Sequence, residues 1–210
     1  MDDISFLQAE FKQALKDFSV VPKSCPAAAE NWGSLINGRP IPDDAFQCCL
    51  ALKCHDCQGG QAYCLLQGIG CTKDLTLALI LASESASKGS RYGQITLAKI
   101  LYDTDRIQAI LLCLRAAKQG LGRALFYIGK ELLKGTNVPR DFEEAHKWLQ
   151  LAADMEDPEG LCLLANCFLE GKGVPKNTNT AIGLFERAER AGYRFAKTAL
   201  WLSRYEPIKV

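Results

Sequence analysis

Landmark residues in the second half of this chain recur at a fixed interval of 36 residues, and this period restricts the fold more than any other feature. The repeated landmarks are a glycine, an Asp or Asn and two small residues, in the series Gly135/Gly171, Asp141/Asn177, Ala145/Ala181 and Ala124/Gly160/Ala196. Independent landmarks that share one offset indicate short units stacked in a row, because such a unit buries its apolar face only against its neighbours. The sequence therefore predicts a repeat protein rather than a single globular core.

Each unit carries the pattern of two helices joined by a short turn. An apolar helix ends at Gly135, and a turn that contains Val138 and Pro139 follows. Asp141 then offers a side chain that can cap the next helix by accepting its free backbone N–H groups. Ala145 follows on that helix, where we expect a small side chain because two helices cross closely only over small residues.

The units upstream are less regular. Gly93 lies 31 residues before Ala124. Asp105 keeps the distance of 36 residues to Asp141, so this unit has lost five residues in the turn between its helices. Two earlier units are marked by the pairs Gly68/Asp74 and, in a divergent form, Gly38/Asp44.

The two ends of the chain differ from the units between them, as the terminal caps of a repeat protein do. Apolar residues at helical spacing between positions 3 and 18 predict an N-terminal capping helix, which a linker joins to the repeats. We therefore divide the chain into residues 1–29 (capping helix and linker), 30–192 (repeats, the first two divergent and rich in cysteine) and 193–210 (C-terminal capping helix).

The combined pattern resembles the Sel-1-like repeat family, a relative of the tetratricopeptide repeat. The resemblance covers roughly residues 30–205 and is carried by Ala124-x3-Ile128-Gly129, Gly135, Val138-Pro139-x-Asp141, Ala145-x2-Trp148 and Ala152-Ala153, with their copies. It implies an all-α, right-handed α-solenoid of about five helical hairpins with capping helices, in which the first helix of each hairpin lines a concave surface. It also implies an adaptor or scaffold role in signalling, in complex assembly or in bacterial interactions.

If the first helix of each hairpin lines the concave surface, its residues outside the Leu-Gly/Ala packing positions should face a partner. These predicted partner-binding residues are Tyr92, Ile95, Lys99, Tyr102, Arg123, Phe126, Lys130, Lys134 and Asn166. Residues 91–140 contain nine Lys or Arg and three acids, whereas residues 141–175 contain eight acids and two lysines. A basic surface interleaved with aromatic rings suits an acidic or amphipathic protein.

The primary prediction is therefore a non-enzymatic protein–protein interaction module. One alternative is a dedicated inhibitor or immunity-type protein that occludes the active site of a partner enzyme. Another alternative is that the charge blocks are simply solvated faces of a solenoid. The oligomeric state stays open.

Ten cysteines in 210 residues suggest a further alternative, a metal- or redox-responsive regulator that uses the cysteines between Cys48 and Cys71. Thiolates of a Cys-x-x-Cys pair can bind zinc, and the candidate ligands are Cys48, Cys54, Cys57 and Cys64. No second Cys-x-x-Cys is present, so the simpler interpretation is that these cysteines occupy small packing positions of helices. We therefore predict no bound metal.

Several functional classes fit the sequence poorly. A net charge of +1 argues against nucleic-acid binding, and two histidines without a phosphate loop or nucleophile motif argue against an enzyme or a cofactor. No apolar run reaches the ~20 residues that span a bilayer. The acidic N-terminus lacks the pattern of a signal peptide, so we expect a cytoplasmic protein without membrane insertion.

Overall fold

The structure, a computed structural model, describes residues 3–16, 54–136, 138–193 and 195–205. Regular structure in these ranges is all α-helix. The helices are α1 (Asp3–Lys16), α4 (His55–Gln67), α5 (Leu75–Ser87), α6 (Arg91–Leu101), α7 (Arg106–Lys118), α8 (Gly122–Lys134), α9 (Phe142–Asp154), α10 (Pro158–Glu170), α11 (Thr178–Arg190) and α12 (Ala196–Tyr205). Within the described ranges no helix has both the length and the apolar character needed to cross a bilayer. The predicted first unit around Gly38 and Asp44 lies outside the described residues.

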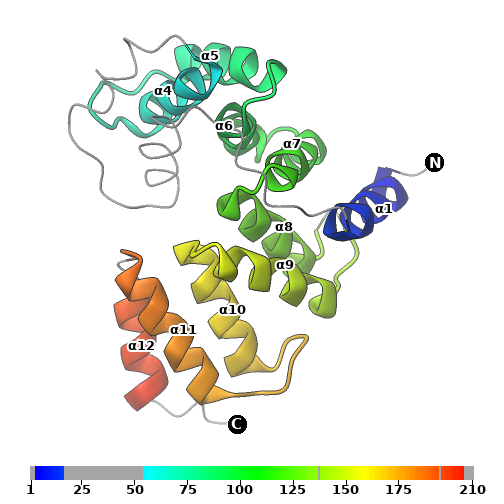
Figure 1. The fold of residues 1–210 in the computed structure, drawn as a ribbon, viewed down its shortest axis with the longest axis vertical. Helices are drawn as coiled ribbons and strands as arrows, with labels where there is room; N and C mark the ends of the chain where they lie inside the picture. The colour runs from blue at the N-terminus through cyan, green and yellow to red at the C-terminus, as the bar shows by residue number, and fades with distance from the viewer. Residues whose placement is uncertain (1–2, 17–53, 137, 194, 206–210) are drawn as a thin grey trace.

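The described residues form a stack of four helical hairpins, which confirms the predicted all-α solenoid (Figure 1). We call α4, α6, α8 and α10 the A helices and α5, α7, α9 and α11 the B helices. Each B helix packs against the A helix of its own hairpin, and α4 also packs on α6 and α8 on α10. Because helices on the inner side of a curved stack lie closer together, we infer that the A helices line that side.

The predicted caps begin every B helix. Asp74, Asp105, Asp141 and Asn177 each accept a hydrogen bond from the backbone N–H three residues further on, at 2.9–3.1 Å. Asp157 caps α10 in the same way through the N–H of Gly160, at 2.8 Å. Because a cap bond involves only neighbouring residues, the repeat pattern identified the starts of the four B helices correctly.

The α6–α7 hairpin shows where the five missing residues were lost. α6 has 11 residues and α8 has 13, which accounts for two of them. The turn 102–105 is three residues shorter than the turn 135–141, which accounts for the rest. The long turn starts at Gly135 in the left-handed conformation, whereas the short turn starts at Tyr102 in the right-handed helical conformation. The shortening therefore places a tyrosine side chain where regular units have a glycine.

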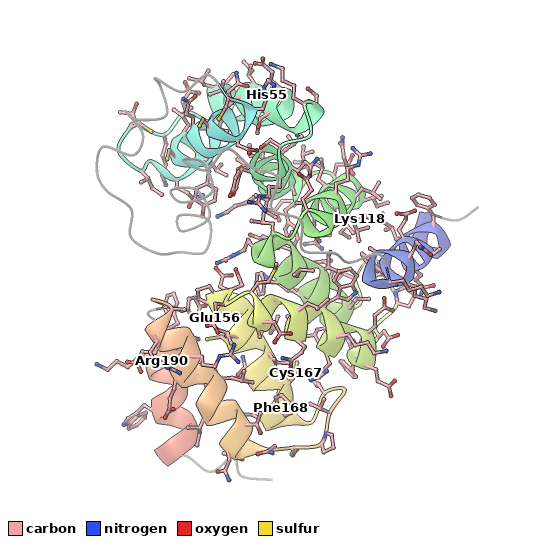
Figure 2. The ribbon with its side chains drawn as sticks, in the orientation of Figure 1. His55, Lys118, Glu156, Cys167, Phe168 and Arg190 are labelled. Carbon is pink, nitrogen blue, oxygen red and sulfur yellow. The ribbon has the colours of Figure 1, made fainter. Side chains whose placement is uncertain are left out.

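The two terminal helices occupy different places. α12 packs against α11 at the end of the stack. α1 lies instead on the side of the stack, against α7, and its Phe11 ring packs edge-on against Trp148 of α9 at 6.2 Å (Figure 1). Lys118 of α7 approaches Glu10 of α1 at 3.4 Å, and Figure 2 shows Lys118 on that side. Thus α1 covers B helices in the middle of the stack, whereas the sequence placed it at the N-terminal end as a cap.

Candidate partner-binding site

The candidate site lies at the junction between α6 and α8, which differs from the other junctions between A helices. α6 and α8 are not packed closely together, and side chains bridge them instead. The ring of Tyr102, at the end of α6, lies 5.9 Å from the ring of Tyr127 on α8. The hydroxyl of Tyr102 donates a hydrogen bond to the buried carboxylate of Glu131. The shortened α6 thus ends in a tyrosine that is fixed against the next A helix.

Basic groups lie over the aromatic rings around this bridge. Lys99 Nζ is 5.0 Å from the Tyr63 ring centre, and Lys130 Nζ is 5.5 Å from that of Phe126. The guanidinium of Arg106 lies 4.5 Å from the Tyr102 ring centre. We call these groups the basic–aromatic cluster, which consists of Tyr63, Lys99, Tyr102, Arg106, Phe126, Tyr127, Lys130 and Lys134. Each such contact of a cation with a ring face contributes about 0.5–2 kcal/mol, depending on how far it is shielded from water.

The lysines of the cluster have no carboxylate partner in the part of the chain that the structure describes. Among the described residues, none of Lys99, Lys130 and Lys134 forms an ion pair. Burial and the nearby Arg123 lower the pKa of Lys99, and burial together with Lys134 lowers the pKa of Lys130. The Nε of Arg106 is buried and has no hydrogen-bond partner within the described ranges. Positive charge that is half-buried and uncompensated in this way favours binding of an anionic group.

Arg123 behaves differently, because the structure gives it acidic partners. Its Nε donates to Asp157 at 2.9 Å, and its second nitrogen pairs with Glu159. Burial opposes the charged form, but the two carboxylates outweigh it and raise the pKa of Arg123, so the guanidinium stays protonated. Asp157 and Glu159 therefore neutralise the almost fully buried Arg123, whereas Lys99 and Lys130 form no ion pair with any described residue.

The other predicted residues fall into three groups. Tyr92 and Ile95 are 1% and 3% exposed and belong to the core, so we leave both out of the proposed binding surface. Phe126 is buried under Arg123 and Lys130, so it supports the cations rather than facing solvent. Asn166 is exposed on α10.

Sequence reasoning missed Tyr63 and Tyr127. Tyr63 is the ninth residue of α4, as Lys99 is of α6 and Lys130 is of α8. This shared register could have identified Tyr63 as a member of the basic–aromatic cluster. Tyr127 has no such signal, because its role depends on the position of the Tyr102 ring.

The candidate zinc ligands do not form a metal site in the described part of the chain. No group of three or more His, Cys, Asp or Glu side chains there is arranged to hold a metal ion. Cys54 and Cys57 lie side by side, with their sulfur atoms 2.7 Å apart. Cys64 is buried on the same helix, and Cys48 lies outside the described residues.

Solved structures with similar folds support the architecture. A Sel1 repeat protein from Oxalobacter formigenes is 22% identical, with a TM-score of 0.59, over 82% of this chain and 53% of that chain. A protective antigen of uropathogenic Escherichia coli with an SLR fold is 20% identical, with a TM-score of 0.59, over 94% of this chain and 41% of that one. Helicobacter pylori cysteine rich protein B is 24% identical, with a TM-score of 0.50, over 61% of this chain and 96% of that chain. At these identities the likeness concerns the fold alone, and this chain spans only about half or less of the first two proteins.

Sequence comparison gives a more specific result. No curated protein matches the chain. The family model described as Sel1 repeat, however, matches residues 59–90, 100–121, 122–157 and 158–193, which is more than half of the chain. Three of these segments each overlap both helices of one hairpin, and the segment 100–121 covers α7 with only the last two residues of α6. The chain therefore belongs to the Sel1 repeat family.

Proposed function

We propose that this protein is a non-enzymatic interaction module that binds an acidic or amphipathic protein across α6 and α8. Sel1 repeat proteins generally serve as protein-interaction scaffolds. The observation that carries the proposal is the pair of half-buried ammonium groups, Lys99 and Lys130, which lie on aromatic rings without an ion-pair partner among the described residues. Carboxylates of a partner would compensate these charges.

The chemistry around the lysines favours a protein partner. Ammonium groups on ring faces are partly stabilised by the rings, but they keep N–H donors that a carboxylate can accept. The rings of Tyr63, Tyr102 and Tyr127 are partly exposed and offer apolar contact beside these donors. Glu159 and Glu131 lie close enough to raise the pKa of Lys130, although other effects outweigh them. Their negative charge disfavours a uniform polyanion such as nucleic acid and favours a partner with separate acidic and apolar side chains.

A charge-reversal experiment tests the proposal. The bait would be the full chain, captured with its partners from native cells, beside Lys130→Glu with Lys134→Glu. Lys172 and Lys176 are exposed in the turn between α10 and α11 and do not belong to the cluster, so Lys172→Glu with Lys176→Glu changes the net charge equally and serves as the control. We expect the first variant to lose a protein that wild type and control retain, with circular dichroism showing all three helical. Equal retention by both variants would rule out binding at the cluster.

The same experiment separates a scaffold from an inhibitor. A captured enzyme whose activity falls on titration with this protein would indicate an inhibitor or immunity-type role. A captured protein whose own activity is unchanged would indicate an adaptor.

A further inference from the structure

The start of α4 brings two thiols together in a way that the proposed binding site does not use. Cys54 is the N-cap residue of α4, and its sulfur accepts a hydrogen bond from the Cys57 N–H at 3.2 Å. The thiol of Cys54 also donates to the sulfur of Cys57 at 2.7 Å. A disulfide bond measures about 2.05 Å, so only a small movement separates this contact from a covalent bond.

The backbone that carries the pair is fixed by neighbouring helices. The carbonyl of His55, between the two cysteines, accepts a hydrogen bond from Ser85 Oγ at 2.6 Å. Gly59, in the next turn, is in such close contact with α6 that a Cβ there would lie 2.4 Å from Gly93 N. The two sulfur atoms are thus held near each other by the fold, which reduces the entropy lost when a bond forms between them.

Three described cysteines further along the chain, Cys113, Cys162 and Cys167, are buried in other helices. Burial raises the pKa of Cys113, that of Cys162 to about 12 and that of Cys167 to about 11, each with smaller effects from nearby acids. Thiols of this kind remain protonated and unreactive, because the thiolate is the nucleophile. Cys54 is instead partly exposed, while Cys57 is fully buried beside it. This difference suggests an order of reaction.

We propose that Cys54 and Cys57 form a redox-active dithiol, which closes to an intramolecular disulfide by exchange with a small disulfide of the glutathione type. The Cys54 thiolate attacks the external disulfide, forms a mixed disulfide and releases one small thiolate. The Cys57 thiolate then attacks the Cys54 sulfur and releases the second small thiolate. The two protons from the cysteines pass to the two released thiolates. One disulfide is therefore reduced for each protein disulfide formed.

The test oxidises the reduced full chain in glutathione mixtures, blocks free thiols by alkylation and maps the peptides after trypsin digestion. Cleavage after Lys53 and Lys73 gives one peptide that contains Cys54, Cys57, Cys64 and Cys71, so fragmentation assigns each thiol. We expect a Cys54–Cys57 disulfide, with the other two cysteines alkylated.

Variants separate the two steps. In Cys57→Ser we expect a glutathione mixed disulfide on Cys54 at about tenfold higher occupancy than in wild type, because the attacking second thiol is gone. Cys71→Ser serves as the control and should keep the wild-type disulfide. The proposal is overturned if both cysteines stay alkylated while other thiols oxidise, if Cys54 pairs instead with Cys48 or Cys49, or if the folded Cys57→Ser variant gives no mixed disulfide.

Discussion

Two junctions between successive A helices are built from opposite chemistry. α4 meets α6 through glycine, since a Cβ on Gly59 would lie 2.4 Å from the backbone nitrogen of Gly93. α8 meets α10 through charge, since Arg123 bonds to Asp157 at 2.9 Å and also pairs with Glu159. At the α4–α6 junction the backbones lie too close for a side chain, whereas at the α8–α10 junction buried charged side chains lie between the helices. The repeat therefore conserves the helix arrangement and not the interaction that holds successive units together.

The junction between α6 and α8 is held neither by glycine contacts nor by a buried ion pair in the described part of the chain. α6 ends early, and the rings of Tyr102 and Tyr127 bridge to α8 in place of close helix packing. Half-buried lysines that have no carboxylate partner among the described residues lie beside this bridge. The least regular of these junctions is thus the one at which we propose that a partner binds.

Loss of Arg123 should have the largest effect on stability. Arg123→Ala leaves the carboxylate of Asp157 buried without its partner, and removing one member of a buried pair costs about 3–5 kcal/mol. Urea unfolding followed by circular dichroism measures this loss. Arg123→Met with Asp157→Asn removes both charges while asparagine keeps the cap on α10, so this double variant should be more stable than the single one. Equal loss in the two variants would contradict the importance of the unpaired charge.

A methyl group at Gly59 should weaken the glycine junction. Gly59→Ala places a Cβ against backbone atoms of α6, which cannot move as a side chain can, so we expect a loss of about 1–3 kcal/mol. Gly183 on α11 is the matched control, because nothing lies within 4 Å of its added Cβ. Gly183→Ala should raise the stability by about 0.5–1 kcal/mol, since alanine favours a helix. Thermal unfolding compares the two, and a stable Gly59→Ala would show that the junction is loosely packed.

The sequence predicted the local features of the stack well because short-range contacts determine them. Asp141 caps α9 through a residue three positions away, and Gly135 takes a left-handed conformation that glycine favours. A repeat period identifies such features without knowledge of neighbouring units. The five missing residues before Asp105 were also recognised, but not their division between the turn and the end of α6.

Features that depend on contacts between distant segments could not be predicted. The side position of α1 depends on Phe11 meeting Trp148, more than a hundred residues away. The burial of Tyr92 and Ile95 likewise depends on what surrounds α6 rather than on their helical register. For the candidate site, the lysines and Tyr102 could therefore be predicted from the sequence, but their contacts with the aromatic rings of the cluster could not.

Removing the Tyr102 hydroxyl should have a smaller effect, confined to the middle junction. Tyr102→Phe keeps the ring beneath Arg106 but removes the hydrogen bond to the buried carboxylate of Glu131. A hydrogen bond to a charged group contributes about 1.5–3 kcal/mol. Because Thr136 still donates to Glu131 at 3.2 Å, we expect the free energy of unfolding to fall by about 1.5 kcal/mol. Tyr63→Phe is the control and should be nearly neutral, because the Tyr63 hydroxyl forms no hydrogen bond with any described residue. If neither variant changed the stability, the contact between the Tyr102 and Tyr127 rings alone would stabilise the junction.

The weakest effect should be a pH dependence from the unpaired lysines. Burial lowers the folded-state pKa of Lys99 and Lys130 below the value of 10.5 that the unfolded chain keeps. Between the lowered pKa and 10.5 the unfolded chain binds more protons, so these lysines make the folded state relatively more stable as pH rises through that window. Urea unfolding of wild type and of Lys99→Met with Lys130→Met, at steps from pH 7 to 10, measures the difference. We expect the free energy of unfolding of wild type to increase relative to that of the variant as the pH approaches 10. An acidic ligand bound at the cluster should reverse the trend, because pairing raises the pKa of both lysines and makes binding strongest below the window. Parallel stability curves for the two proteins would show that the lysines are as well solvated as surface ones, and would remove the main reason to place a partner at this junction.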